Sequence, residues 1–154
     1  MNYEEKARKL FKDGYNCAQA VLLAFSDLTG LDEKTALVLS ASFGGGMGRL
    51  REVCGAVSGT FMVAGLLYGP EDPNDHEAKM NHYALIQHLA AEFRKANGSY
   101  ICRELLDLPA GPSSPEPEKR TEAYYHRRGC GDYVGIAAGI MERYIKDNPP
   151  KKQS

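Results

Sequence analysis

Cysteine is the residue type in this sequence with the most distinctive chemistry. Four cysteines are present, separated by steps of 37, 48 and 28 residues. No two of them form a C-x-x-C pair, so the spacing matches no zinc finger, thioredoxin-type motif, ferredoxin run or covalent haem attachment. The candidate catalytic and metal-binding residues are these four: Cys17, Cys54, Cys102 and Cys130.

Cys54 lies at the junction between a short polar segment, residues 49–52, and an apolar one. The sixteen residues 53–68 contain no charged side chain. The thiol is therefore expected near a helix start, half sheltered, where backbone N–H groups carry partial positive charge. These conditions favour a reactive or metal-binding thiolate.

The other three cysteines also follow breaks in the pattern. Cys17 comes after a cap-type asparagine, Cys102 comes three residues after a serine, and Cys130 comes after a glycine. If the four predicted helix starts converge, their positive ends should lower the thiol pKa values from about 8.5 towards neutral. The alternative is that the cysteines fill core space as small apolar side chains, which is common for cysteine.

A glycine cluster precedes Cys54, with four glycines among residues 44–48. Glycine adopts positive φ and lets other backbone approach closely. Neither G-x-G-x-x-G after a strand nor G-x-x-x-x-G-K-[ST] is present, so a phosphate-binding loop is disfavoured. The pattern favours a tight turn that brings this backbone against the cysteine site. The candidate cofactor-binding glycines are Gly44, Gly45, Gly46 and Gly55.

Apolar periodicity, capping residues and glycine breaks predict helices along the chain. The segment 51–68 carries a stripe of small residues that suits a central helix packed closely against a neighbour. No strand or internal repeat is indicated, and the proline-rich segment 108–117 is typical of a mobile loop. We therefore expect an all-α, single-domain bundle of about six helices with a central glycine-rich helix. The predicted helices span residues 2–12, 17–28, 32–42, 51–68, 74–96, 100–106 and 130–147, and residues 118–128 are expected to be partly helical. In the helix at 32–42, the side chains expected to face inward are Leu37, Val38 and Ala41.

Length and charge narrow the class of protein. The chain has 154 residues, a net charge of −1 and a pI near 6.4, which indicates one domain and no nucleic-acid partner. We place the domain at residues 1–147 and a frayed tail at 148–154. The charged N-terminal segment is unlike a secretory signal, and residues 53–68 fall short of the ~20 apolar residues of a membrane-spanning helix. No membrane insertion and a cytoplasmic location are expected, where structural disulfides are rare.

Histidine gives little support for hydrolytic chemistry. His76, His82 and His88 share one predicted helix at steps of six residues. Neighbours in that series point in different directions, so they do not form a common site. His126 stands alone, and a lone surface histidine is the usual case.

Several short motifs together resemble one protein family. They are G-Y-N-C at 14–17, F-G-G-G-M-G at 43–48, C-G-A-V-S-G at 54–59, C-R-E-L-L at 102–106 and the final Cys130. Their order resembles the bacterial and archaeal redox-active proteins of the C_GCAxxG_C_C family, over residues 7–144. The four cysteines that define the family match those of this chain one for one. The segment 51–53, just before Cys54, departs from the Gly-Glu pair that many relatives show close to the corresponding cysteine.

The resemblance implies redox chemistry at the cysteines, with no settled substrate. Family members often look like neighbours of transport or electron-transfer genes. A related domain also occurs in some iron-containing electron carriers, so the resemblance leaves an iron–sulfur centre open.

Three hypotheses for the function remain. In the first, a disulfide forms and breaks, with Cys54 as the attacking or electron-accepting thiolate, Cys17 as its first expected partner, and an unidentified redox partner outside the chain. In the second, the four thiolates hold Zn²⁺ or an iron–sulfur cluster. In the third, the protein is a helical interaction module with incidental cysteines. The small-residue stripe could also face a second copy, which would make a homodimer.

Overall fold

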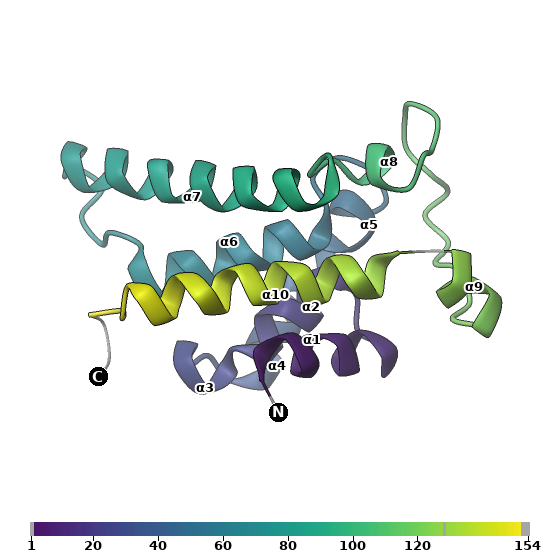
Figure 1. Ribbon diagram of the computed structural model, residues 1–154, viewed down its shortest axis with the longest axis horizontal. Coiled ribbons are helices and arrows are strands. Elements are labelled where there is room, and N and C mark those ends of the chain that lie inside the picture. Colours follow the sequence, from purple (N-terminus) through teal and green to yellow (C-terminus); the bar gives the residue numbers. More distant parts are fainter. Residues whose placement is uncertain (1, 128, 152–154) are drawn as a thin grey trace.

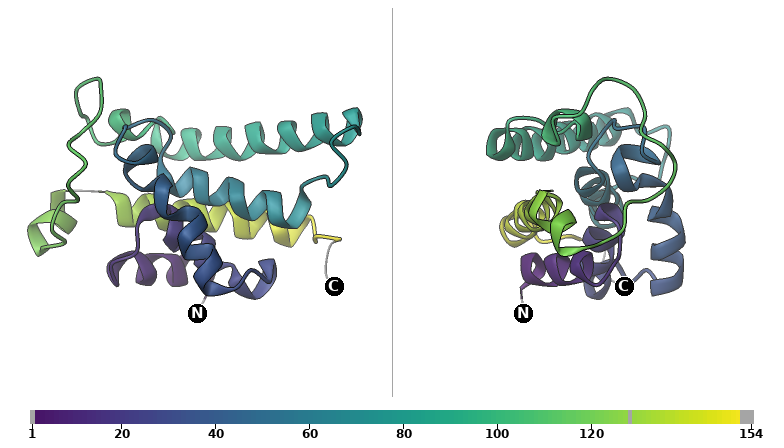
Figure 2. Two further views of the ribbon diagram at one scale, coloured as in Figure 1. Left: turned by 180° about the vertical axis from the view of Figure 1, so that it is seen from behind. Right: turned by 90° about the vertical axis from the view of Figure 1, so that its right-hand side faces the viewer.

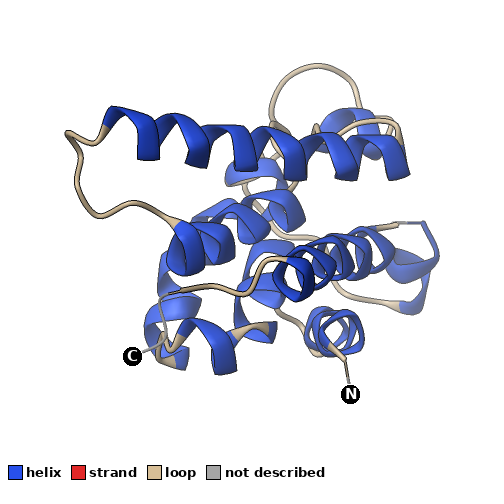
Figure 3. Cartoon of the chain, turned by 60° about the vertical axis from the view of Figure 1, so that its left-hand side comes forward, coloured by secondary structure: helices blue, strands red, loops and turns tan. Residues whose placement is uncertain are grey.

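The computed structural model describes residues 2–127 and 129–151, and within these ranges the regular structure is helical (Figures 1 and 3). Six helices in this part of the chain have eight or more residues, and shorter helical turns add to them, so the expected number of about six is not exact. The helices are α1 (Tyr3–Lys12), α2 (Cys17–Ala24), α3 (Ser26–Thr29), α4 (Glu33–Ser40), α5 (Gly44–Met47), α6 (Gly55–Tyr68), α7 (His76–Asn97), α8 (Cys102–Leu105), α9 (Glu122–Arg127) and α10 (Cys130–Asp147).

Side-chain caps set the starts of four of the longer helices. In each case an Asn or Asp side chain accepts a hydrogen bond from the backbone N–H three residues later, which satisfies a donor that the first turn leaves free. At α2 the arrangement is reciprocal, because the Gln19 side chain also accepts from the backbone N–H of Asn16. The capping residues are Asn2, Asn16, Asp32 and Asp75.

Two helices, α2 and α6, occupy the middle of the fold. Figure 1 shows α7 along one side of the molecule and α1, α3 and α4 along the opposite side, with α2, α6 and α10 between them. Nearly every side chain of α2 is buried, and α6 packs on α2, α7 and α10. The starts of α6 and α10 lie at the end of the molecule that carries α5, α8 and α9 (Figure 2). The glycine-rich helix is therefore central, as expected, and α2 shares that position.

Glycines on α6 allow its close contact with α2. A Cβ on Gly59 would lie 2.8 Å from the carbonyl oxygen of Ala18, and a Cβ on Gly55 would lie 3.0 Å from Cys17 Cβ. Gly65, the third glycine of the stripe, has open space at its Cβ position. The predicted close packing is thus correct for Gly55 and Gly59. Because this surface is covered by the chain's own α2, a homodimer, which stays a prediction, would need another surface.

Three predicted details are wrong. The segment 17–28 is not one helix, because it is interrupted at Phe25 between α2 and α3. α6 begins at Gly55 instead of residue 51, because residues 51–54 are drawn into contact with residues 100–103. On α4 the buried positions are Ala36 and Ser40, while Val38, expected to face inward, is 69% exposed. An eight-residue helix with few apolar residues on each face leaves the buried side ambiguous in sequence.

None of the described helices is long and apolar enough to cross a membrane. The apolar run at 53–68 instead forms a buried helix with α2, α7 and α10 around it. Of the predicted tail, residues 148–151 follow the end of α10, and residues 152–154 lie outside the described part of the chain.

The α2–α6 contact can be tested with a pair of glycine substitutions. Gly59→Ala should lower the free energy of unfolding by about 1–3 kcal/mol, because the added methyl group would press on Ala18 backbone. Gly65→Ala, the matched control in the same helix, should raise it by up to about 1 kcal/mol, because alanine is the better helix former and its Cβ has room. Urea denaturation followed by circular dichroism measures both. Equal effects of the two substitutions would contradict this packing.

Candidate functional site

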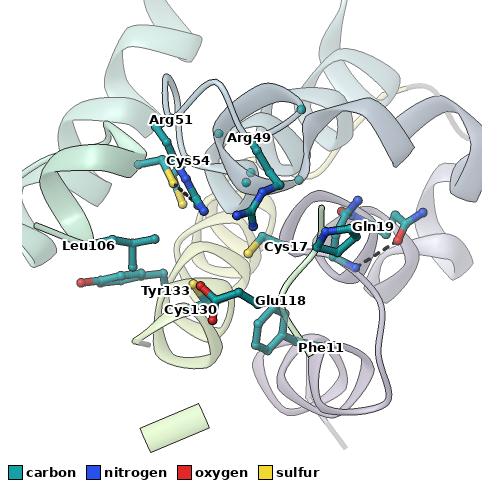
Figure 4. Close-up of a pocket in the computed structure, with 18 of the residues that line it drawn as sticks. Phe11, Cys17, Gln19, Arg49, Arg51, Cys54, Leu106, Glu118, Cys130 and Tyr133 are labelled. Carbon is teal, nitrogen blue, oxygen red and sulfur yellow. Dashed lines mark hydrogen bonds between the residues drawn. The ribbon is translucent and has the colours of Figure 1, made fainter. Parts of the chain in front are cut away.

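All four cysteines lie at helix starts, as the sequence indicated. Cys17, Cys102 and Cys130 are the first residues of α2, α8 and α10, and Cys54 is the residue just before α6. Their thiols are free, with Cys54 and Cys102 buried and Cys17 and Cys130 half-buried. The four helix starts converge on one cavity of about 440 Å³, and all four cysteines line it (Figure 4).

A short antiparallel backbone pairing brings two of the cysteines together. Val53 pairs with Ile101, the Cys54 N–H donates to Tyr100 O at 2.8 Å, and the Cys102 N–H donates to Glu52 O at 2.6 Å. Side chains alternate along an extended strand. Cys54 and Cys102 each follow a paired residue directly, so both thiols fall on the opposite face from Val53 and Ile101. That face borders the cavity.

The other two cysteines meet across the packed helices α2 and α10. A side-chain hydrogen bond with Cys130 is the largest cause that raises the pKa of Cys17, and burial of the thiol is the second. The expected partner of Cys17 was Cys54. The structure places Cys17 near Cys130, but charge on Cys54 also raises the pKa of Cys17, so a Cys17–Cys54 pairing stays a prediction. Figure 4 shows Cys17 and Cys130 below Arg49 and Arg51.

The predicted glycines form the wall of the site. A Cβ on Gly46 would lie 2.6 Å from Cys102 Cβ, and one on Gly44 would lie 2.7 Å from the Asn16 side chain. Gly45 and Gly46 have φ near +70°, which favours glycine. The turn therefore brings backbone against both the cysteines and the cap of α2, and Gly44, Gly45, Gly46 and Gly55 all line the cavity. Cofactor binding by these glycines stays a prediction.

Arg51 is the residue of this site that the sequence reasoning missed. Its side chain is 4% exposed, Nε donates to Ser113 Oγ at 2.8 Å, and Nη1 donates to Cys102 Sγ at 3.5 Å. Its backbone is left-handed, with φ of +64°. The available signal was its position between a glycine turn and an uncharged run, where a charged side chain has few routes to solvent.

The proline-rich loop at 108–117 is attached to the glycine turn. Ser113 N–H donates to Arg49 O at 2.9 Å, Arg51 Nε donates to Ser113 Oγ, and Arg49 Nε donates to Ser114 O. Pro115 and Pro117 line the cavity. The composition predicted a mobile segment, whereas the structure shows one tied by hydrogen bonds over the cysteine site.

The expected fall in thiol pKa is wrong for Cys54. Burial raises the pKa of the Cys54 thiol to about 12 and outweighs the N–H groups of Ala56 and Val57 at the start of α6, which act in the opposite direction. Negative charge on Cys130 and Cys102 raises it further. The helix start does favour the thiolate, but loss of hydration is the larger effect at this depth.

Tyr133 is a further titratable group at the cavity. Burial, followed by charge on Cys130, raises the pKa of Tyr133, whose hydroxyl donates to Leu105 O at 3.2 Å. Tyr133 lines the cavity, whereas none of the four histidines does. The structure therefore supplies no cysteine–histidine pair at this site.

The four sulfurs suit soft metals by their chemistry, but their placement does not match a preformed centre. Among residues 2–127 and 129–151, no group of three or more His, Cys, Asp or Glu side chains is arranged to hold a metal ion. A four-thiolate zinc site requires all four sulfurs at about 2.3 Å from one ion, whereas in an iron–sulfur cluster the four sulfurs bind different irons. As they stand, the described residues do not fit a single-ion site.

Comparison with known proteins gave one match. A family model described as "Putative redox-active protein (C_GCAxxG_C_C)" matches residues 15–144. That range includes all four cysteines and the glycine turn. No curated protein and no solved structure matches the chain.

Replacement of Cys54 should change how stability depends on pH. The folded-state pKa of about 12 lies above the unfolded value of about 8.5, so the neutral thiol adds stability that is complete below pH 8.5 and is lost as pH rises towards 12. Cys54→Ala removes this contribution. Its deficit in unfolding free energy relative to the unmodified protein should therefore shrink between pH 8.5 and 11, as measured by urea denaturation. A deficit that stays constant over this range would contradict the burial of a protonated thiol.

Proposed function

The chain belongs to the C_GCAxxG_C_C family of redox-active proteins, and from that premise we propose that it is a thiol–disulfide redox protein whose working pair is Cys17 and Cys130. The observation that carries the proposal is the closeness of these two thiols in a cavity that all four cysteines line, where a side-chain hydrogen bond with Cys130 is the largest cause that raises the pKa of Cys17. Two thiols in hydrogen-bonding contact need little movement to form a disulfide. As whole residues, both are also less buried than Cys54 and Cys102.

The two sulfurs have different roles in this proposal. The pKa of Cys17 is raised, first by the hydrogen bond with Cys130 and then by burial, so Cys17 keeps its proton and suits the role of resolving thiol. Cys130 is the first residue of the eighteen-residue helix α10, where backbone N–H groups favour a thiolate, and the thiolate is the nucleophile. We therefore assign Cys130 as the attacking sulfur.

With a disulfide R–S–S–R as oxidant, the exchange balances in two steps. The Cys130 thiolate attacks one sulfur of the oxidant, forming a mixed disulfide and releasing RS⁻. Cys17 then loses its proton to the released thiolate and attacks Cys130 Sγ, forming the Cys17–Cys130 disulfide and releasing the second RS⁻, which takes a proton from solvent. Two protein thiols are oxidised and the reactant becomes two RSH.

Cys54 and Cys102 have a different part in this proposal. The raised pKa of Cys54 keeps it protonated at neutral pH, which disfavours it as the attacking group. Cys102 is buried behind the Gly46 backbone and contacts Arg51. We assign these two to the wall of the cavity, where they shape the surroundings of the working pair.

Disulfide mapping tests the pair directly. Oxidation of the reduced protein with a small excess of a disulfide should lower the titratable thiols from four to two, and peptide mass spectrometry should recover the Cys17–Cys130 link. Cys17→Ser and Cys130→Ser should each abolish this product. Cys54→Ser, the matched control from the other side of the cavity, should retain it. Recovery of a Cys54–Cys102 link instead would overturn the assignment.

The same preparations can be tested for a metal centre. If the thiols work as a dithiol pair, protein purified under anaerobic conditions should carry far less than one equivalent of iron, zinc and acid-labile sulfide. It should also show no visible absorbance. A full equivalent of iron with sulfide would identify an electron-transfer centre and would contradict the proposed exchange.

A further inference from the structure

The lining of the cysteine cavity has more positively than negatively charged side chains. Its described charged side chains are three arginines, Arg49, Arg51 and Arg120, and one carboxylate, Glu118. Within residues 2–127 and 129–151 none of the three arginines forms an ion pair. Arg49 donates to Ser114 O, and Arg120 donates to the carbonyl oxygens of Phe11 and Tyr15 at 2.8 and 3.1 Å. Neutral oxygens therefore hold these two side chains, and the described charged side chains of the cavity carry a net positive charge.

Arg51 is the strongest case, because it is buried. Removing a charged group from water is expensive unless an opposite charge compensates for it. The side-chain hydrogen-bond partners of Arg51 in the described part of the chain are a serine hydroxyl and the Cys102 sulfur. The guanidinium is a planar fork suited to carboxylates and other oxyanions. Among the described residues, Arg51 has no carboxylate partner for this fork.

The backbone adds to the same electrostatic effect. The starts of α6 and α10, helices of fourteen and eighteen residues, lie at the cavity and carry partial positive charge. The cavity volume of about 440 Å³ falls within the range of small-molecule sites. Figure 4 shows Arg49 and Arg51 extending from the glycine turn into this space, above Cys17 and Cys130. An anion in the cavity would meet both the arginines and the proposed working pair.

We propose that the cavity binds a small organic anion, with Arg51 as the main anchor and Arg49 beside it, and that the disulfide reactant of this protein is therefore anionic. The statement about the reactant rests on the proposed redox function, whereas the anion site rests on the cavity alone. Carboxylates placed near the disulfide of the reactant would be held at Arg51 while its sulfur faces Cys130. Arg51 is a positioning residue in this scheme, since it binds the reactant at a distance from the bond that breaks.

Two disulfide reagents that differ in charge test whether Arg51 anchors an anion on the reduced full-length protein. One is 5,5′-dithiobis(2-nitrobenzoate), which carries two carboxylates, and the other is the neutral 2,2′-dithiodipyridine. The rate with each reagent is divided by the rate of a small free thiol with the same reagent, which corrects for the different intrinsic reactivities of the two reagents. The protein should prefer the anionic reagent, and Arg51→Met should reduce that preference about tenfold, which corresponds to ~1.4 kcal/mol. Arg94→Met, at an exposed position near the end of α7, should leave the preference unchanged.

Competition by an unreactive anion gives a readout that needs no variant. Sulfate should slow the reaction of the unmodified protein with the neutral reagent more than chloride does at equal ionic strength. Because Arg51→Met could fail to fold, Arg51→Lys and Arg49→Met provide second variants. The lysine keeps the charge without the fork and should retain part of the preference, whereas Arg49→Met should reduce it less than Arg51→Met does.

Each outcome of the reagent and sulfate experiments either supports or overturns the anion site. Loss of preference with sulfate protection supports the anion site. An equal slowing of both reagents by Arg51→Met, without sulfate protection, would show that Arg51 serves only the Cys102 sulfur, and no effect on either reagent would also overturn the proposal. Failure of the redox function is separate, because it would appear as a preserved preference for the anionic reagent without a Cys17–Cys130 disulfide.

Discussion

The close packing of α6 on α2 is the constraint on which the site depends. Gly55 and Gly59 have no side chain where the backbone of Ala18 and the Cβ of Cys17 approach. This contact sets the start of α6, with Cys54, beside the start of α2, with Cys17. The same glycines weaken the helix in isolation, by roughly 1 kcal/mol each relative to alanine, so tertiary burial must maintain it. The geometry of the thiols thus follows from a helix that its own propensity supports poorly.

Backbone and side-chain hydrogen bonds between segments that are distant in sequence complete the cavity. The single pairing of Val53 with Ile101 holds the approach to α6 against the approach to α8, and the long helix α7 lies between them in the chain. The proline-rich loop then returns to the glycine turn through Arg49 and Arg51. Each connection consists of only a few hydrogen bonds, and all of them converge at the end of the molecule that carries the cysteines. Rigid helices therefore position the thiols, and loops supply the charged lining.

Two electrostatic effects oppose each other in this cavity. Helix starts and arginines favour negative charge, whereas burial disfavours any charge, and the balance differs from one position to another. At Cys54 burial dominates, so the thiol keeps its proton. At Arg51 the charge persists in spite of burial, because guanidinium does not give up its proton in proteins. This contrast explains how one site can hold protonated thiols and a region of positive potential together.

The sequence by itself determined the approximate course of the longer helices and the position of each cysteine near a helix start, because these depend on residues within one or two turns of each other. It did not determine the break at Phe25 or the start of α6 at Gly55. It also indicated the family, since the family is recognised from several short motifs in a fixed order along the chain. Only the tertiary structure decided that Cys17 lies close enough to Cys130 for this neighbour to have the largest effect on its pKa, and that burial raises the pKa of Cys54. It also decided that Arg51 and the loop at 108–117 belong to the site. These properties arise from contacts between residues tens of positions apart and from the depth of each group below the surface, and neither is encoded in the local pattern.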